Sequence, residues 1–390
     1  MEKYLERGVS AAKEEVYKAI EGLQQGLYPK AFCKIYPDWL CGDNQYVTAM
    51  SSDGCGTKSI LAYLYKQETG DASVWQGIAT DALVMNIDDL LCVGASGPFL
   101  FNSIINRNKN IITSDDLKEL IQGSAAFCSM MAEYGISIHY MGGETADLGD
   151  VVRTVTVDAT LAARLHKNQL ILTENIRPGL VIVGLASYGQ AIYEKQYNSG
   201  ISSNGLTSAR HDLLSKLYAE KFPETYDPGL SPDVVYCGKY RLTDPLPDTP
   251  LTIGQALLSP TRTFAPLVKQ LLQQLPGKIA ALINCTGGGQ TKVLHYLPKG
   301  LTVVKDKLLP VPPLFKFIQQ ESGTNWKEMF RVYNCGTRME VYVEETDAKA
   351  IIEAAKSFHI EAQIIGYVEA NSADTAKVVI TGNYGTYEYE

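Results

Sequence analysis

The 390-residue chain has few histidines and no closely spaced cysteine pair. Its five histidines are dispersed, and its eight cysteines form no Cys-x-x-Cys motif, so a zinc site is poorly supported. Such scattered cysteines indicate reduced and mostly buried thiols. The sequence also contains no recognisable combination of serine or cysteine with histidine that would indicate a nucleophilic triad.

Basic runs and long apolar runs are also missing. The chain has 35 Lys and Arg against 43 Asp and Glu, a net charge of −8, so a nucleic-acid partner is not expected. The longest apolar stretches, such as residues 180–186, are far shorter than a membrane span. Residues 1–7 are charged and lack the apolar core of a signal peptide. We therefore expect a cytoplasmic protein without a membrane partner.

Two glycine-rich segments carry acidic residues: residues 51–58 read SSDGCGTK, and residues 142–147 read GGETAD. Each follows a short apolar run that predicts a strand, and the first leads into a helical pattern. Backbone N–H groups beside glycine can bind phosphate oxygens, while carboxylates can bind a divalent cation. Since an acidic chain must screen its own charge to bind a polyphosphate, these segments predict a site for magnesium and a polyphosphate.

Asp53 is the strongest single candidate in the first segment. Gly54 and Gly56 allow a ligand to approach closely, Thr57 begins the predicted helix, and Lys58 supplies a cation. The alternative is an ordinary turn in which Asp53 caps the helix. The segment is not a Walker A loop, and no Gly-x-Gly-x-x-Gly motif follows a predicted strand elsewhere.

A third acidic element lies in the helix predicted over residues 75–93. Asp89 follows Asp81 by eight residues, close to two turns, so we expect these two to share a face, with Asp88 about 100° away from Asp89. Because the flanking residues are apolar, burying these acids without a cation is costly. A solvated helix face is the alternative.

Glu144 follows Gly142 and Gly143 at the end of a predicted strand. One glycine would suffice for a turn, so we favour metal ligation over a simple turn. We therefore predict one metal site built from four carboxylates. They are Asp53, Asp81, Asp89 and Glu144.

The length indicates two domains, at residues 1–172 and 173–390, near a boundary marked by Arg-Pro-Gly at 177–179. Both are mixed α/β in pattern, and residues 222–250 read as an irregular surface excursion. A first helix is expected after Ser10, with Val16, Ile20, Leu23 and Leu27 on its apolar face. Strands are predicted at 46–50, 98–105, 136–140, 151–161, 180–186, 279–284, 339–343, 362–368 and 378–381. Further helices are predicted at 57–67, 75–93, 260–273 with a possible kink at Pro266, 315–320 and 326–330, with two more beginning near 113 and 206.

The second half contains two polar glycine loops, at residues 202–205 and 286–289. Asn204 in the first, and Gly287 and Gly288 in the second, could present hydrogen-bond donors to an anion. Each loop alone is a weak signal, and an ordinary turn is the simpler interpretation.

With these residues in view, nearly the whole chain resembles the aminoimidazole ribonucleotide synthetases, or phosphoribosylformylglycinamidine cyclo-ligases. The Asp-Gly-Cys-Gly-Thr-Lys segment at 53–58 is similar to the family's Asp-Gly-Val-Gly-Thr-Lys, and Gly-Gly-Glu-Thr-Ala at 142–146 matches outright. Further similar segments follow in the expected order. They lie at 4–10, 81–90, 203–205, 259–262, 286–289 and 333–336.

The resemblance implies ATP and Mg²⁺ as cofactors, formylglycinamidine ribonucleotide as substrate, and a role in purine biosynthesis. It also implies a homodimer whose N-terminal sheets pair in a barrel, with a C-terminal α/β domain completing the site. Asp53, Lys58 and Asn204 would be catalytic. Nucleotide binding would use Gly54, Gly56, Thr57, Lys58, Asp81, Gly142, Gly143, Gly287 and Gly288.

The chain departs from the family pattern at several positions. Asp88 stands where the family has Asn, Arg338 where it has a small residue, and Ser202 where a His is often found. Ser10 stands where Asp is usual, and Gln-Thr-Lys at 290–292 replaces an aromatic-Glu-Asn type. Residues 222–250 have no obvious counterpart.

Two alternatives to a cyclo-ligase remain open at this point. One is a related ATP-dependent enzyme of the same architecture, such as a thiamine-phosphate kinase, a selenophosphate synthetase or a formylglycinamidine synthetase. The other is a non-catalytic paralogue that binds a nucleotide and regulates another protein. The departures at 88, 202 and 338 favour the paralogue, whereas the retained acids at 53, 81, 89 and 144 argue against it.

Overall fold

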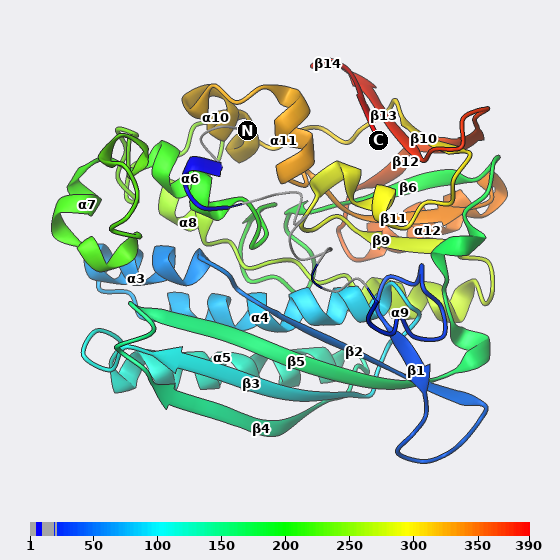
Figure 1. The fold of residues 1–390 in the computed structure, drawn as a ribbon, viewed down its shortest axis with the longest axis horizontal. Coiled ribbons are helices and arrows are strands. Elements are labelled where there is room, and N and C mark those ends of the chain that lie inside the picture. Colours follow the sequence, from blue (N-terminus) through cyan, green and yellow to red (C-terminus); the bar gives the residue numbers. More distant parts are fainter. Residues whose placement is uncertain (1–4, 10–18, 20–21) are drawn as a thin grey trace.

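The computed structural model describes residues 5–9, 19 and 22–390 (Figure 1). The part of the first predicted helix that carries Val16 and Ile20 lies outside the described residues. Leu23 and Leu27, expected on the same face, are described and are not helical, and the positive φ of Gly22 and Gly26 beside them does not fit a helix.

The first half of the chain forms a five-stranded mixed sheet. Only the β3–β4 pair is parallel among its neighbours, and the other three pairs are antiparallel. The strands, in spatial order, are β1 (Ile35–Pro37), β2 (Tyr46–Gly54), β5 (Val155–His166), β3 (Phe99–Arg107) and β4 (Ile138–Asp147).

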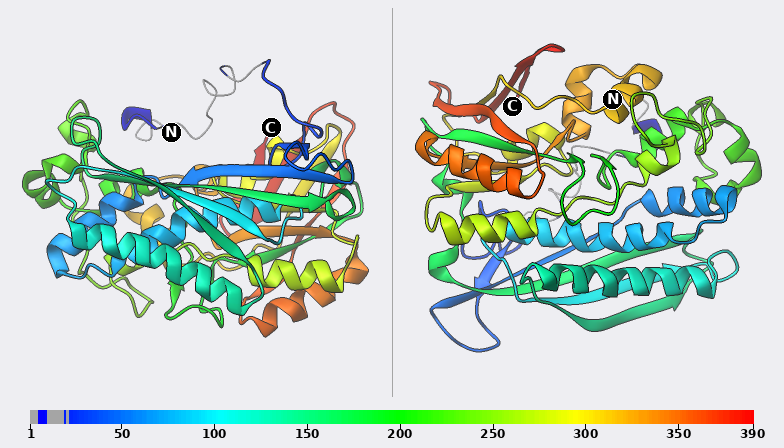
Figure 2. Two further views of the ribbon diagram at one scale, coloured as in Figure 1. Left: turned by 90° about the horizontal axis from the view of Figure 1, so that it is seen from below. Right: turned by 180° about the vertical axis from the view of Figure 1, so that it is seen from behind.

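Three helices lie along this half: α3 (Lys58–Thr69), α4 (Val74–Leu91) and α5 (Ser114–Glu133). The start of α5 is fixed by a capping box between Thr113 and Asp116, as the sequence pattern predicted. The strands stand in front in Figure 1 and α4 and α5 stand in front in the right-hand view of Figure 2, so both helices lie on the same side of the sheet.

The opposite face of this sheet carries exposed apolar side chains. Met50 on β2 is 56% exposed, and Leu100 and Ile104 on β3 are 47% and 40% exposed. Met50 and Leu100 both pair with Ala162 of the intervening strand β5, so the exposed side chains lie on neighbouring strands. No described helix covers this face (Figure 1).

The second half forms a seven-stranded mixed sheet with helices around it. Its strands, in spatial order, are β14 (Gly385–Tyr389), β13 (Lys377–Gly382), β10 (Leu301–Lys305), β12 (Ala362–Ala370), β6 (Val181–Ala186), β11 (Thr337–Val343) and β9 (Ala281–Asn284). The remaining α-helices of the described chain are α6 (Leu206–Leu213), α7 (Leu217–Lys221), α8 (Ile253–Leu257), α9 (Ala265–Gln274), α10 (Pro313–Ser322), α11 (Trp326–Val332) and α12 (Glu345–Ser357). A short β7–β8 pair (Tyr188–Gly189, Asn198–Ser199) precedes α6. The expected two-domain α/β architecture with mixed sheets is confirmed.

Several predicted boundaries are wrong, and in each case a neighbouring element supplies the reason. Strand β2 continues through Asp53, which pairs with Ala159, and β4 continues through Glu144, which pairs with Ile104. Asp53 and Glu144 therefore lie within strands rather than after them. Helix α9 begins at Ala265, so Pro266 occupies its first turn, where proline fits without a kink.

The second half was predicted incompletely. Strand β10 inside the sheet and helices α7, α8 and α12 have no counterpart among the predicted elements. The last strand is β14, which pairs with β13 as a hairpin that the sequence reading missed. Residues 222–250 contain short 3-10 turns, at Pro223–Thr225 and Pro232–Val234, and isolated β-bridges, in agreement with the expected irregular structure. The expected surface position is wrong for part of the segment, because Tyr236, Leu242 and Leu246 are buried. Among the described helices, none combines the length and apolar character needed to cross a membrane.

Candidate functional site between the two domains

Helix α4 lies between the two halves of the chain. It packs against β2 and β5 on one side and against α9 and β9 on the other (Figure 1). Nearly all of its residues are buried, including Asp81 and Asp88. Because a buried carboxylate needs a compensating charge or hydrogen bonds, the partners of these acids decide how the two halves fit together.

Asp81 forms a buried ion pair with Lys58. The Lys58 Nζ lies 2.9 Å from Asp81 Oδ1, and both side chains are fully buried. Lys58 also donates to the carbonyl of Ser259 at 2.7 Å, while Thr261 N donates to Asp81 Oδ1 at 2.8 Å. Burial lowers the pKa of Lys58, although Asp81 opposes the change. The two groups predicted to bind phosphate and metal thus neutralise each other inside the domain interface.

Asp88 forms a second buried ion pair, with Arg338 of β11. Thr263 Oγ1 donates to Asp88 Oδ1 at 2.8 Å, and Nη2 of Arg338, which binds Asp88, also donates to the carbonyl of Arg262. Burial raises the pKa of Asp88, and Arg338 acts against that increase. The cation that this acidic helix was expected to need is therefore supplied, at these two acids, by protein side chains.

The prediction that Asp81 and Asp89 share one face of the helix is wrong. Asp81 and Asp88 both contact residues 261–264, whereas Asp89 contacts Asn284. At about 100° per residue, seven residues leave Asp88 only about 20° from Asp81, while eight residues leave Asp89 about 80° away. Asp81 and Asp88 share the face, and Asp89 points elsewhere.

Three of the predicted loops meet across the interface. A Cβ at Gly56 would lie 3.7 Å from the carbonyl oxygen of Ser203, and a Cβ at Gly287 would lie 3.7 Å from Asn204 Oδ1. The hydroxyls of Thr57 and Thr207 are 2.9 Å apart. The structure therefore brings together the predicted residues of 54–57, 204 and 287–288, which come from both halves of the chain.

The second-domain part of this site offers polar groups to a ligand. Ser203 Oγ and Asn204 Nδ2 are buried and have no hydrogen-bond partner within the described chain. Gly287, Gly288 and Gly289 all have positive φ, at 47°, 129° and 51°, a backbone that side chains rarely adopt. Unpaired donors beside a glycine turn suit an anion such as phosphate.

The first-domain part offers two carboxylates. Asp53 is exposed, and its carbonyl oxygen accepts a hydrogen bond from Asn86 Nδ2 at 3.1 Å, which ties β2 to α4. Asp89 accepts from Asn284 Nδ2 at 2.8 Å. Burial raises the pKa of Asp89 to about 7, and the charge of Asp53 adds to the increase, which indicates that the two are close.

These two carboxylates fit a magnesium ion bound together with a phosphate. Mg²⁺ in proteins is often held by one or two carboxylates, with substrate phosphates and waters as the other ligands. Among the described residues, no cluster of three or more His, Cys, Asp or Glu side chains could hold a metal alone. Asp53 and Asp89 are therefore the residues that would hold this ion.

Glu144 lies apart from Asp53 and Asp89. It is exposed on the edge strand β4, and β3 and β5 separate that strand from β2. Three strand spacings correspond to about 14 Å. The four predicted metal ligands are thus not gathered at one place in the chain. Packing also requires glycine at position 143, which the sequence did not predict, because a Cβ there would lie 2.0 Å from the carbonyl oxygen of Ser103.

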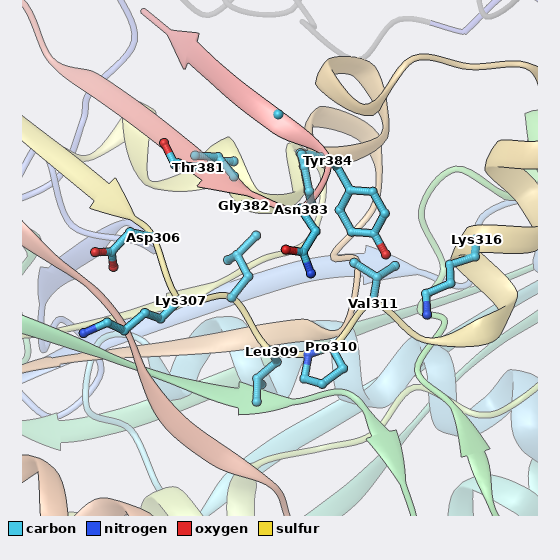
Figure 3. A pocket seen from close by; sticks show the side chains of 14 residues that line it. Asp306, Lys307, Leu309, Pro310, Val311, Lys316, Thr381, Gly382, Asn383 and Tyr384 are labelled. Atoms are coloured by element: carbon cyan, nitrogen blue, oxygen red, sulfur yellow. The ribbon is translucent and has the colours of Figure 1, made fainter.

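A cavity of about 760 Å³ adjoins the Gly56–Thr57 turn. Arg210 and Thr207 of α6 line it together with Tyr226, so the irregular excursion at 222–250 forms part of its wall. A smaller cavity of about 320 Å³ lies between residues 306–311 and the β13–β14 turn (Figure 3). None of the predicted site residues lines that smaller cavity.

Sequence reasoning missed Asn284 and Arg210 and did not foresee the role of Arg338. Asn284 could have been noticed, because it ends a predicted strand directly before the loop at 286–289. Arg210 and Arg338 gave no local signal, since their partners lie far away in the sequence.

Two family models match this chain. Residues 37–164 match the model described as AIR synthase related protein, N-terminal domain, and residues 250–379 match its C-terminal domain. This chain belongs to the AIR synthase related protein family. The family model ranges cover each of the two sheets in part and include Asp53, Asp89 and the loop at 286–289.

Similar proteins of this family span most of the chain. A phosphoribosylformylglycinamidine cyclo-ligase of Methanocaldococcus jannaschii is 29% identical, covering 83% of this chain and 78% of the relative. One of Bacillus licheniformis is 30% identical, covering 84% and 82%. A solved structure, AaThiL complexed with AMPPCP and TMP, covers 96% of both chains with a TM-score of 0.56 at 12% identity, a likeness of fold alone.

The Asp88–Arg338 ion pair of this AIR synthase relative can be tested by a double-mutant cycle. Asp88→Asn and Arg338→Met should each lower the free energy of unfolding by about 3–5 kcal/mol, because each leaves a buried charge without its partner. The free energy of unfolding of the double variant should be much closer to that of the wild type. Urea denaturation followed by circular dichroism measures all four proteins.

Lys299→Ala is the control, since Lys299 pairs with Asp374 on the exposed surface. It should change the free energy of unfolding by no more than about 0.5 kcal/mol. Additive losses in the double variant would contradict the pairing.

Proposed function

We propose that this protein catalyses the ATP-dependent ring closure of formylglycinamidine ribonucleotide to aminoimidazole ribonucleotide, ADP and phosphate, a step of purine biosynthesis. One observation carries the proposal: Asp53 and Asp89 of the first domain lie at an interface where the second domain presents unpaired donors beside Gly287–Gly289. The cyclo-ligases similar to this chain over most of their length support this choice of reaction.

The proposed chemistry requires positioning more than a protein nucleophile. A formyl amide oxygen is a poor leaving group, so transfer of the γ-phosphoryl group of ATP onto it forms an iminophosphate. The other substrate nitrogen then attacks that carbon, closes the ring and expels phosphate. Such a reaction depends on alignment of the two substrates and on neutralised phosphate charge. Mg²⁺ would supply that neutralisation when bound.

The residues of the chain divide this work between the domains. Asp53 and Asp89 would hold the cation. The turn at Gly56 leaves room for a phosphate beside them, whereas Gly54 is packed, since a Cβ there would lie 2.0 Å from Asp158 Oδ1. Asn204 Nδ2 and the Gly287–Gly289 turn would bind and orient a phosphate group of one substrate. Lys58, which is fully buried against Asp81, would act by holding the domains in register rather than by contacting the nucleotide.

A phosphotransfer reaction on another acceptor is the second candidate. It is favoured by Ser202, which stands where the resembling family often has His, and by the excursion at 222–250 that walls the cavity near Gly56. The fold is also that of AaThiL, whose solved complex contains AMPPCP and TMP. In this case the carboxylate pair and glycine turns would serve the same nucleotide, and the cavity wall would select the acceptor.

The direct test supplies formylglycinamidine ribonucleotide with MgATP and measures aminoimidazole ribonucleotide and ADP. The proposal predicts both products in equal amounts. Asp53→Asn should lower turnover at least about a hundredfold, because one of the two cation ligands loses its charge. The folded state of this variant is checked by circular dichroism.

Asp374→Asn, a change in an exposed surface ion pair, is the matched control and should keep full turnover. ATP hydrolysis or binding without ring closure would favour the second candidate or a regulatory role. Normal turnover by Asp53→Asn would refute the cation assignment.

We also propose that the protein forms a homodimer through the open face of the five-stranded sheet. Exposed Met50, Leu100 and Ile104 give this face an apolar surface that no described helix covers. The double variant Leu100→Glu/Ile104→Glu should be monomeric, because paired faces would bury four like charges. Light scattering after gel filtration measures the mass.

Ile192→Glu is the control, since Ile192 is a similarly exposed apolar residue outside this sheet, at 45% exposure. It should leave the dimer intact. A wild type that is monomeric at micromolar concentration would contradict the dimer.

A further inference from the structure

A buried series of side chains connects Asp88 and Asp89 through the second domain. Arg338 pairs with Asp88 and donates from Nη1 to Asn284 Oδ1 at 3.0 Å. Asn284, the last residue of β9, donates from Nδ2 to Asp89 Oδ1 at 2.8 Å. Asp88, Asn284 and Arg338 are all fully buried, so this connection is shielded from water.

Arg338 decides which way the Asn284 amide points. A guanidinium group can only donate hydrogen bonds, so the amide oxygen must face Arg338 and the amide NH₂ must face Asp89. A reversed amide would place its oxygen against the Asp89 carboxylate, with two acceptors in contact.

Arg338 itself is held in place on several sides. Its Nη2 donates to Asp88 and to the carbonyl of Arg262, and its Cζ lies 5.1 Å from the centre of the Phe264 ring. Because the guanidinium is planar and its partners are fixed, its other terminal nitrogen, Nη1, points in one direction, toward Asn284. The orientation of Asn284 is therefore built into the domain interface.

We propose that Arg338 is a positioning residue for the cation site, acting through Asn284 to hold the Asp89 carboxylate. In this arrangement Asp89 Oδ1 is occupied by the amide, and Oδ2, which accepts no hydrogen bond from any described residue, is left for a divalent cation. The inference rests on the proposed function, which assigns that cation to Asp53 and Asp89.

Asp88 and Arg338, the two departures from the resembling family, compensate each other's charge. Asp88 replaces an Asn and Arg338 replaces a small residue. Either change alone would bury an uncompensated charge, whereas together they form one ion pair. The pair adds an outer layer to the cation site, and such outer partners commonly change metal affinity by about 10–100-fold.

The experiment measures Mn²⁺ binding in the presence of ADP by electron paramagnetic resonance, which needs no turnover. Asn284→Ala and the double variant Asp88→Asn/Arg338→Met should each weaken Mn²⁺ binding by about 10–100-fold. Asp88→Asn alone should bind Mn²⁺ within about threefold of the wild type. In that variant Arg338 still donates to Asn284, and outer partners that keep their bonds preserve the site.

The combined variant Asp88→Asn/Arg338→Met/Asn284→Ala should bind Mn²⁺ no more weakly than Asn284→Ala does, because Arg338 acts through the Asn284 amide. Circular dichroism and thermal melting establish that each protein is folded. If Asp88→Asn/Arg338→Met does not fold, Asp88→Asn/Arg338→Ala, closer to the residue types of the resembling family, repeats the test.

Asp89→Asn separates this inference from the proposed function. If Asp89→Asn leaves Mn²⁺ binding unchanged, the cation assignment in the proposed function is wrong. If Asp89→Asn weakens binding but Asp88→Asn/Arg338→Met does not, the cation assignment stands and the positioning role of Arg338 is refuted.

Discussion

The structure depends on neutralising the acids of one buried helix. Helix α4 carries Asp81 and Asp88 into the interface between the two domains, where water cannot solvate them. Lys58 from the first domain and Arg338 from the second provide the opposite charges. Because removing one partner of such a pair leaves a buried charge, the interface tolerates little displacement.

This constraint also places the candidate site. Residues 261–264 of the second domain donate hydrogen bonds to both acids, and the carbonyl of Ser259 accepts one from Lys58, so the domain docks on α4 in one orientation. That orientation brings the Gly56 turn against Ser203 and sets Asn284 against Asp89. Each domain alone holds only half of the groups that a nucleotide with a cation would contact, so the interdomain Asp88–Arg338 pair and the proposed activity depend on the same geometry.

Local patterns in the sequence predicted much of the fold and part of the site. The capping box at Thr113, the helix starting after Gly205 and the glycine turn at 287–289 are encoded by neighbouring residues, and the structure contains all three. The continuation of β2 and β4 depended on pairing with strands more than thirty residues away, which no local pattern reports. The Asp88–Arg338 pair joins residues 250 positions apart. Such a contact cannot be read from spacing.

The central claim is that the acids of α4 are divided, with Asp81 and Asp88 bound by side chains and Asp89 available to a cation. Crystals grown with Mn²⁺ and a non-hydrolysable ATP analogue test it most directly, by an anomalous difference map at the manganese edge. The account predicts a peak between Asp53 and Asp89, facing the turn at 287–289. A peak on Asp81, with Lys58 displaced from its present contact, would contradict it.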